Sequence, residues 1–234
     1  MNEEPRDIGS DDAAPVQQAR PLVLSQALRE RTAEPHTRAE RTGIVNDILR
    51  GKASRDGYVL LLRNLLPAYE AMEQGLERHR TSAGVGKFAR REIYRSGALH
   101  ADLAALAGDD WMRDLPLLPA GRQYGKRVAE ASRGDGARLI AHAYARYLGD
   151  LSGGQILKTL LGRSLGLTDT ALSFYDFPKI ADHKVFKAEF RDALDRAGEE
   201  VADIDSVIEE GAVAFELNID VSNAVQAAAK DAAY

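Results

Sequence analysis

The chain has 234 residues, of which 44% are hydrophobic and 29% charged, a mixture typical of one soluble globular domain. Its formal net charge of -5 gives no reason to expect binding to nucleic acid or to a membrane surface. The sequence contains no cysteine, which excludes disulfides, thiolate-bound metals and a cysteine nucleophile.

The first 20 residues are polar, include two prolines and show no hydrophobic periodicity. Such a segment buries too little apolar surface to offset the entropy of ordering it, so we expect residues 1–20 to be a disordered acidic tail. The tail does not resemble a signal peptide, and no apolar stretch reaches the ~18–20 residues of a membrane span. We therefore expect a cytoplasmic protein with no membrane-bound part.

Hydrophobic residues then recur at helical spacing, in segments separated by loops that contain Gly and Pro. The pattern predicts a first helix that contains Leu24 and Leu28, with Ser25 as a cap near its start, and a short helix before Gly51. Further helices are predicted at 54–80, 87–106, 119–133, 136–165, 182–197 and 204–229. Because alternating, β-branched runs are absent, we predict an all-α, single-domain helical bundle over residues 21–230.

The segment 144–155, Tyr-Ala-Arg-Tyr-Leu-Gly-Asp-Leu-Ser-Gly-Gly-Gln, places three glycines and an aspartate inside one predicted helix. Gly149 and Gly153 are four residues apart and would share a face that Gly154 widens, so a flat ligand could approach the backbone there. Glycines beside a serine also favour a kink. Close helix packing is the simpler explanation, but Asp150 suits it poorly, because a buried charge needs a partner or a task. Arg146 lies one turn before Asp150.

The five histidines include no pair three or four residues apart, so a zinc-binding pair on one helix is absent. His36 stands out because Glu40, one turn further on, can reach its second ring nitrogen and orient it as carboxylates orient metal-bound histidines. A surface His–Glu pair is the common alternative. Of the other histidines, we expect His79, His100 and His183 at the surface. We expect His142 in the core, as a packing residue.

Two motifs and several shorter pieces carry a resemblance to a known family. Thr-x-x-x-His-x-x-Ala-Glu around His36 and Tyr-Leu-Gly-Asp-Leu-Ser-Gly-Gly-Gln at 147–155 are similar to the proximal-helix and distal-helix motifs of the haem oxygenases. Shorter similar pieces occur in family order at 55–57, 141–144, 174–178 and 214–219. The resemblance implies a soluble, bacterial-type, biliverdin-producing enzyme that holds haem between a proximal helix and a kinked distal helix.

The resemblance assigns roles around the haem iron. His36 would be the axial ligand and would leave the sixth position open for dioxygen, and the backbones of Gly149 and Gly153 would line the distal face. Asp150 would anchor a water that donates a hydrogen bond to the bound oxygen, and so favours attack on the ring over the ferryl chemistry of a peroxidase. By the same resemblance, four more residues belong to the distal network or contact haem: Tyr69, Arg146, Gly154 and Phe215.

The haem propionates need cations. By resemblance these are Lys187 and Arg191, which are four residues apart and would share a helix face, together with Arg29 and the hydroxyl of Tyr144. Plain solubility would explain these charges without the family pattern.

Two positions bear on how the haem would sit. Ala33 replaces a lysine familiar in animal members of the family, which leaves open the meso carbon that is attacked. Pro35 removes a helical N–H and crowds the carbonyl of Arg31, which predicts a kink beside His36.

Two other classes of function remain in view. A haem carrier or sensor would need His36 but not Asp150, Arg146 and Tyr69, and a di-iron oxidase would need Glu-x-x-His ligands that the sequence lacks. The sequence therefore predicts a monooxygenase for which haem b is both prosthetic group and substrate, with O2 as co-substrate. Biliverdin, carbon monoxide and ferrous iron would be the products. Because nothing in the chain binds flavin or nicotinamide, electrons would come from a ferredoxin or flavoprotein reductase, and we expect a monomer.

Overall fold

The computed structural model describes residues 23–231, so the tail predicted at 1–20 lies outside the described residues. Within them the chain is helical, and no strand forms. The α-helices are α1 (Leu24–Glu40), α2 (Gly43–Leu49), α3 (Arg55–Arg78), α4 (Ser96–Ala107), α5 (Trp111–Asp114), α6 (Pro119–Ala131), α7 (Leu139–Ala143), α8 (Gly153–Leu165), α9 (His183–Glu200) and α10 (Ile204–Asp231). Five short turns, η1 to η5, join them: Val85–Phe88, Arg91–Ile93, Tyr144–Leu148, Asp169–Ala171 and Ser173–Tyr175.

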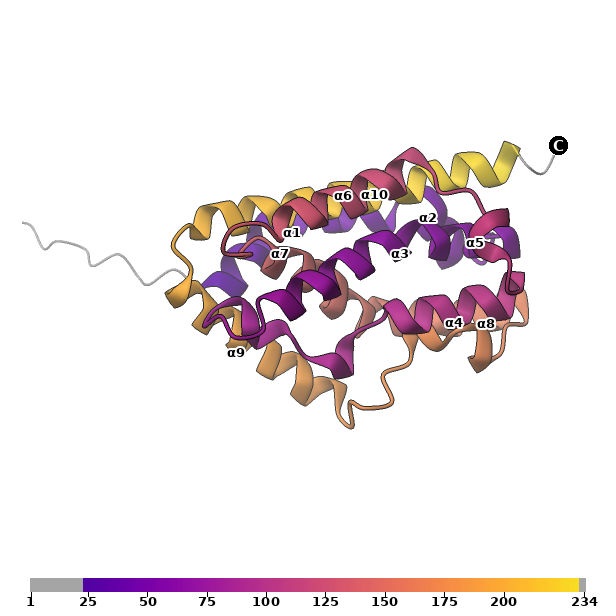
Figure 1. Cartoon of the computed structure of the whole chain (residues 1–234). Helices are drawn as coiled ribbons and strands as arrows, with labels where there is room; N and C mark the ends of the chain where they lie inside the picture. The colour runs from indigo at the N-terminus through magenta and orange to yellow at the C-terminus, as the bar shows by residue number, and fades with distance from the viewer. Residues whose placement is uncertain (1–22, 232–234) are drawn as a thin grey trace, which may run out of the picture.

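Helix α3 is the central element of the bundle, with α6 and α10 above it and α4 below it in the view of Figure 1. Its start is fixed locally, because the Ser54 hydroxyl accepts a hydrogen bond from the Gly57 N–H at 3.0 Å. Its apolar residues at helical spacing are buried as predicted: Leu61, Leu65, Ala68, Met72 and Leu76. Helix α6 lies close against α3 at two glycines. A Cβ at Gly125 would lie 2.7 Å from a Pro67 carbon, so only glycine allows this approach.

Helices α1 and α10 run side by side in the same direction. The side-chain pairs between them keep the same separation in sequence along both helices. Arg31 makes two bonds to Glu209, at 2.9 and 2.8 Å, and Arg38 pairs with Glu216 seven residues further along each helix. Pro35 is buried between these pairs, and α1 continues through it to Glu40. Helix α1, which carries His36, therefore packs along α10.

The prediction of one continuous helix at 87–106 is wrong. Two short turns, η1 and η2, and the loops around them occupy its first half, and α4 begins only at Ser96. The cause is remote in sequence, because the buried Glu73 carboxylate of α3 accepts the Arg95 and Ser96 N–H groups at 2.6 and 2.9 Å and so caps α4. Ser25 is not the cap of α1 either. That position is Val23, while the Ser25 N–H donates to Asp195 on α9 at 2.9 Å.

Within residues 23–231, no helix is both long enough and apolar enough to cross a membrane.

Candidate functional site

The glycine-containing segment is a broken helix. Helix α7 passes into a π-helical turn at Tyr144–Leu148, and α8 starts only at Gly153. Between them Ser152 leaves helical geometry, with φ -120° and ψ -85°. The predicted kink is confirmed, whereas the single helix predicted at 136–165 is wrong. Single-turn π-helices of this kind are frequent at functional sites.

A hydrogen-bonded cluster of Asp150, Tyr69 and Arg146 lies next to this break in the helix. Asp150 is only 4% exposed. Its carboxylate accepts from the Tyr69 hydroxyl at 2.6 Å and from Arg146 Nη2 at 3.1 Å, and Arg146 Nε donates to the same hydroxyl at 2.7 Å. The structure therefore brings together the three distal residues that the sequence singled out, from α3 and from the segment before the break.

Burial sets the electrostatics of this cluster. It raises the pKa of the Asp150 carboxyl against the opposing pull of Arg146 and Tyr69. It also raises the pKa of the Tyr69 hydroxyl, which stays a neutral donor. Burial alone would lower the pKa of the Arg146 guanidinium, but Tyr69 and Asp150 outweigh it and hold that pKa above its usual range. Arg146 is thus a permanent cation beside the carboxylate.

The cluster extends to α10 through residues that the sequence reasoning missed. Asn218 accepts from Arg146 Nη1 and donates to the Tyr124 hydroxyl at 3.0 Å and to the Ala214 carbonyl at 2.7 Å. Two turns earlier, the buried Glu210 lies on the same side of α10. The spacing of Glu210, Ala214 and Asn218 at every fourth position was the available signal, because it places two polar side chains on a buried helix face.

His142 is buried, as predicted, but it is more than packing. Its Nε2 lies 2.9 Å from Glu210 Oε1, and Glu210 also pairs with Arg127. Burial opposes ionisation of Glu210, but hydrogen bonds from His142 and Arg127 outweigh it and lower the pKa of that carboxyl. The pair ties α7, just before the π-helical turn, to α10.

The three glycines of the segment differ in their surroundings. Gly149 and Gly153 are exposed, and a Cβ at either would meet no atom within 4 Å. Gly154 is buried, and a Cβ there would lie 3.1 Å from the Tyr175 ring. The expectation that Gly154 widens the open strip is therefore wrong, since it serves the packing of Tyr175. Gly149 and Gly153 leave open space beside the backbone.

The imidazole of His36 is the exposed counterpart of this buried cluster. Its side chain is 55% exposed, and its ring lies 5.5 Å from that of Phe215 on α10. The Glu40 carboxylate lies 3.8 Å from Nδ1, so it is a nearby charge and not a hydrogen-bond partner. The hydroxyl oxygens of Thr32 and Tyr144 are 3.5 Å apart, which brings the helix of His36 against the π-helical turn.

The chain as a whole is similar to known proteins. The family model described as "Heme oxygenase" matches residues 22–224. Heme oxygenase 1 of Nostoc sp. is 38% identical over 197 residues, which cover 84% of this chain and 83% of that protein. The human heme oxygenase 1 is 38% identical over 215 residues, which cover 91% of this chain and 75% of that protein. The chain belongs to the haem oxygenase family.

Solved haem oxygenase structures share the fold. Heme oxygenase-1 of Synechocystis sp., solved in complex with heme, superposes with a TM-score of 0.83 at 31% identity, covering 91% of this chain and 96% of that one. The haem oxygenase of Leptospira interrogans gives a TM-score of 0.82 at 34% identity, covering 87% of this chain and 100% of that one. The all-α fold predicted from the sequence is confirmed.

The basic residues that the sequence predicts for the propionates make hydrogen bonds to neutral groups or lie exposed. Lys187 is half-buried and its Nζ donates to the Ser152 hydroxyl at the helix break, at 3.2 Å. Arg191 is exposed, and its Nη1 donates to the Lys187 carbonyl at 3.3 Å. Arg29 is exposed on α1. Within residues 23–231, none of the three forms an ion pair, so their charges are available at the surface.

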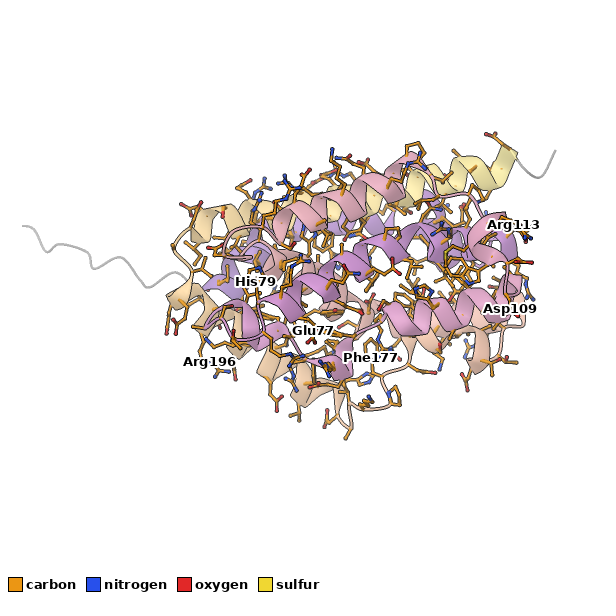
Figure 2. The ribbon with its side chains drawn as sticks, viewed as in Figure 1. Glu77, His79, Asp109, Arg113, Phe177 and Arg196 are labelled. Atoms are coloured by element: carbon orange, nitrogen blue, oxygen red, sulfur yellow. The ribbon has the colours of Figure 1, made fainter. Side chains whose placement is uncertain are left out.

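The three histidines expected at the surface lie there but are half-buried. His79, labelled in Figure 2, has its Nε2 2.9 Å from the Ser132 carbonyl oxygen, and His100 pairs with Glu70 at 2.8 Å. His183 packs edge-on against Phe177. Within residues 23–231, no three His, Asp or Glu side chains cluster as a metal site would require.

Two hollows lie near the two sides of the site. One, of about 590 Å³, is lined by Arg95, Gln155 and Tyr175 among others, and Gly154 lies against the same Tyr175 ring. The other, of about 330 Å³, lies between α1 and α10 at Pro35 and Leu217. The first includes Gln155, the last residue of the distal-helix motif, and the second includes Pro35 beside His36, but neither is lined by His36, Gly149 or Gly153.

Proposed function

We propose that the chain is a biliverdin-producing haem oxygenase. One observation carries the proposal: the open backbone at Gly149 and Gly153 is backed by the buried Asp150, Arg146 and Tyr69 cluster and lies next to the helix that bears His36. A protein that only bound haem would need the open surface and a ligand. It would not need a buried carboxylate beside them, because burying that charge opposes folding.

The residues present fit a haem. Within residues 23–231, no group pairs with His36 Nε2, because Glu40 approaches only Nδ1. Open space beside Gly149 and Gly153 would admit a flat ring, and Phe215 would contact it from the proximal side. Lys187, Arg191 and Arg29, free of carboxylates, together with the Tyr144 hydroxyl, would receive the two propionates. The family relatives solved with heme support this fit.

Bound haem b would supply both the iron at which O2 reacts and the ring that is opened. The protein groups have positional tasks. His36 would bind the iron as a neutral imidazole. Gly149 and Gly153 would keep the distal space narrow, and Asp150 would hold a water that delivers a proton there. Arg146 and Tyr69 keep that carboxylate in place through the bonds described above.

Carbon monoxide and ferrous iron would accompany biliverdin. We propose that electrons reach the haem from a separate ferredoxin or flavoprotein reductase, because the chain has no cysteine for an iron–sulfur cluster. A monomeric, cytoplasmic protein remains our expectation.

Aerobic turnover tests the proposal. The full chain is mixed with one equivalent of haemin, given ascorbate or a ferredoxin system in air, and followed by absorption and chromatography of the pigment. We expect the Soret band to disappear and a green bilin to form, with carbon monoxide released in equal amount. A carrier would keep its Soret band, and that result would refute the enzymatic proposal while leaving haem binding in place.

A further inference from the structure

Gln155, at the end of the distal motif, makes two contacts that the proposed chemistry does not use. Its amide nitrogen Nε2 donates to the Tyr175 carbonyl at 2.9 Å and to the Asp150 carbonyl at 3.3 Å. A side-chain amide nitrogen has two N–H donors and no acceptor. Both donors of Gln155 therefore go to carbonyls, and they join two segments of the chain 25 residues apart in sequence, 150 and 175.

The Asp150 carbonyl lies at the point where the helix stops. The N–H groups of the two residues in the break donate to the carbonyls of Tyr147 and Gly149. The Asp150 carbonyl instead accepts from the Gln155 side chain. A buried carbonyl left without a donor costs about 1–3 kcal/mol, so this bond favours one backbone arrangement at the residue whose carboxylate matters most.

The other end of the bridge is a fixed point. Tyr175 is 3% exposed and ends the turn Ser173–Tyr175. The buried Asp102 of α4 holds that turn by accepting the Ser173 and Phe174 N–H groups at 2.9 and 2.8 Å. Gly154 lies against the Tyr175 ring. A movement of Asp150 away from this turn would therefore have to break the Gln155 bridge.

We propose that Gln155 is a positioning residue that, by bridging the Asp150 and Tyr175 carbonyls, fixes the backbone at the break and keeps the Asp150 carboxylate on Tyr69 and Arg146. The effect on the backbone does not depend on the proposed function. The effect on turnover rests on the proposed function.

Two near-isosteric variants separate the bridge from the size of the side chain. Gln155→Met keeps the length and removes both donors, and Gln155→Glu places carboxylate oxygens against two carbonyl oxygens. The matched control is Gln226→Glu at the α2–α10 junction, where Gln226 Nε2 likewise bridges two acceptors, the Gly43 carbonyl and the Asp47 carboxylate.

The first measurement uses the haem-free chain. Amide hydrogen exchange of peptides covering 149–155 should be at least tenfold faster in Gln155→Glu than in the parent, and faster by a smaller factor in Gln155→Met. Gln226→Glu should leave these peptides unchanged. Parental exchange in both Gln155 variants would overturn the proposal, whatever the protein does with haem.

The second measurement uses the haem-loaded chain treated with hydrogen peroxide. Haem affinity should stay within threefold of the parent, while the ratio of bilin formed to guaiacol oxidised should fall at least fivefold in Gln155→Glu. In an Asp150→Ala background the same substitution should change the ratio no further, because it acts through Asp150. An equal further fall in that background would refute the coupling. A parent that forms no bilin would refute the proposed function, and the exchange measurement would still decide on Gln155.

Discussion

The two sides of the site are built in opposite ways. On the proximal side, His36 is an exposed side chain on one helix, with one ring neighbour and one carboxylate at 3.8 Å. On the distal side, Asp150 is buried, bonded to α3 and the π-helical turn, and connected through Arg146 to α10. The comparison teaches that His36, the proposed iron ligand, can be removed with little effect on folding, whereas the Asp150 carboxylate belongs to the fold as well as to the proposed chemistry.

The largest effect is expected on the exposed side. His36→Ala should abolish normal haem coordination and bilin formation, because the other histidines are engaged elsewhere or buried. The stability of the haem-free protein should change by less than about 0.5 kcal/mol, as is usual for exposed positions. Circular dichroism melting and a haemin titration measure the two effects. Parental bilin yield in the variant would show that another group binds the iron.

Asp150→Ala should combine two effects. Bilin yield should fall on the order of 100-fold, the usual contribution of a positioned proton-transfer group, while haem affinity changes only several-fold. Peroxidase-like oxidation of guaiacol should appear with hydrogen peroxide. Because Arg146 would lose its carboxylate partner but keep its bonds to Tyr69 and Asn218, the fold should also lose about 1–3 kcal/mol of stability.

Asp150→Asn keeps the size of the side chain and should give an intermediate bilin yield. A variant Asp150→Ala that makes biliverdin at the parental rate would reduce Asp150 to a structural partner of Arg146, and the contrast between the two sides would then disappear.

The surface cations should have a smaller effect. Lys187→Glu and Arg191→Glu should each weaken haem binding, by about 10–100-fold where a charge-assisted bond worth about 1.5–3 kcal/mol is lost, and more for the half-buried Lys187 than for Arg191. The mixture of bilin isomers should also change. Arg196→Glu, at an exposed position further along α9 and labelled in Figure 2, is the control for charge alone. Equal losses in all three variants would indicate a general field effect.

The smallest effect separates the glycines. In the haem-free protein, Gly149→Ala should be neutral or stabilise by up to about 1 kcal/mol, because its Cβ enters open space and alanine favours helix. Gly154→Ala should destabilise by about 1–3 kcal/mol, because its Cβ presses on the buried Tyr175 ring. The order should reverse for haem affinity: Gly149→Ala should weaken haem binding, whereas Gly154→Ala should leave it unchanged. Melting curves with and without haemin test both statements.

Local pattern was enough to predict most helices, the kink, and the residues that meet at the site. The periodicity of α3 and the glycines beside Ser152 act over a few residues, and the two family motifs carry His36 and Asp150 directly. The start of α4 could not be predicted, because its cap is Glu73 of another helix. The spacing along α10 could have marked Asn218 as a buried polar position, but not its partners Tyr124 and Arg146, which lie 94 and 72 residues away. Gly154 was misjudged because sequence spacing does not reveal the ring of Tyr175.

Helix α10 contacts both sides of the site within a single turn. Phe215 lies against the His36 ring, and Asn218, three residues on, holds Arg146 of the distal cluster. One turn of α-helix has a rise of about 5 Å that side-chain substitutions scarcely alter. The distance between the contacts that α10 makes with the two sides of the site is therefore fixed by the geometry of the helix. A displacement of α10 would carry both faces with it and leave the width between them nearly unchanged.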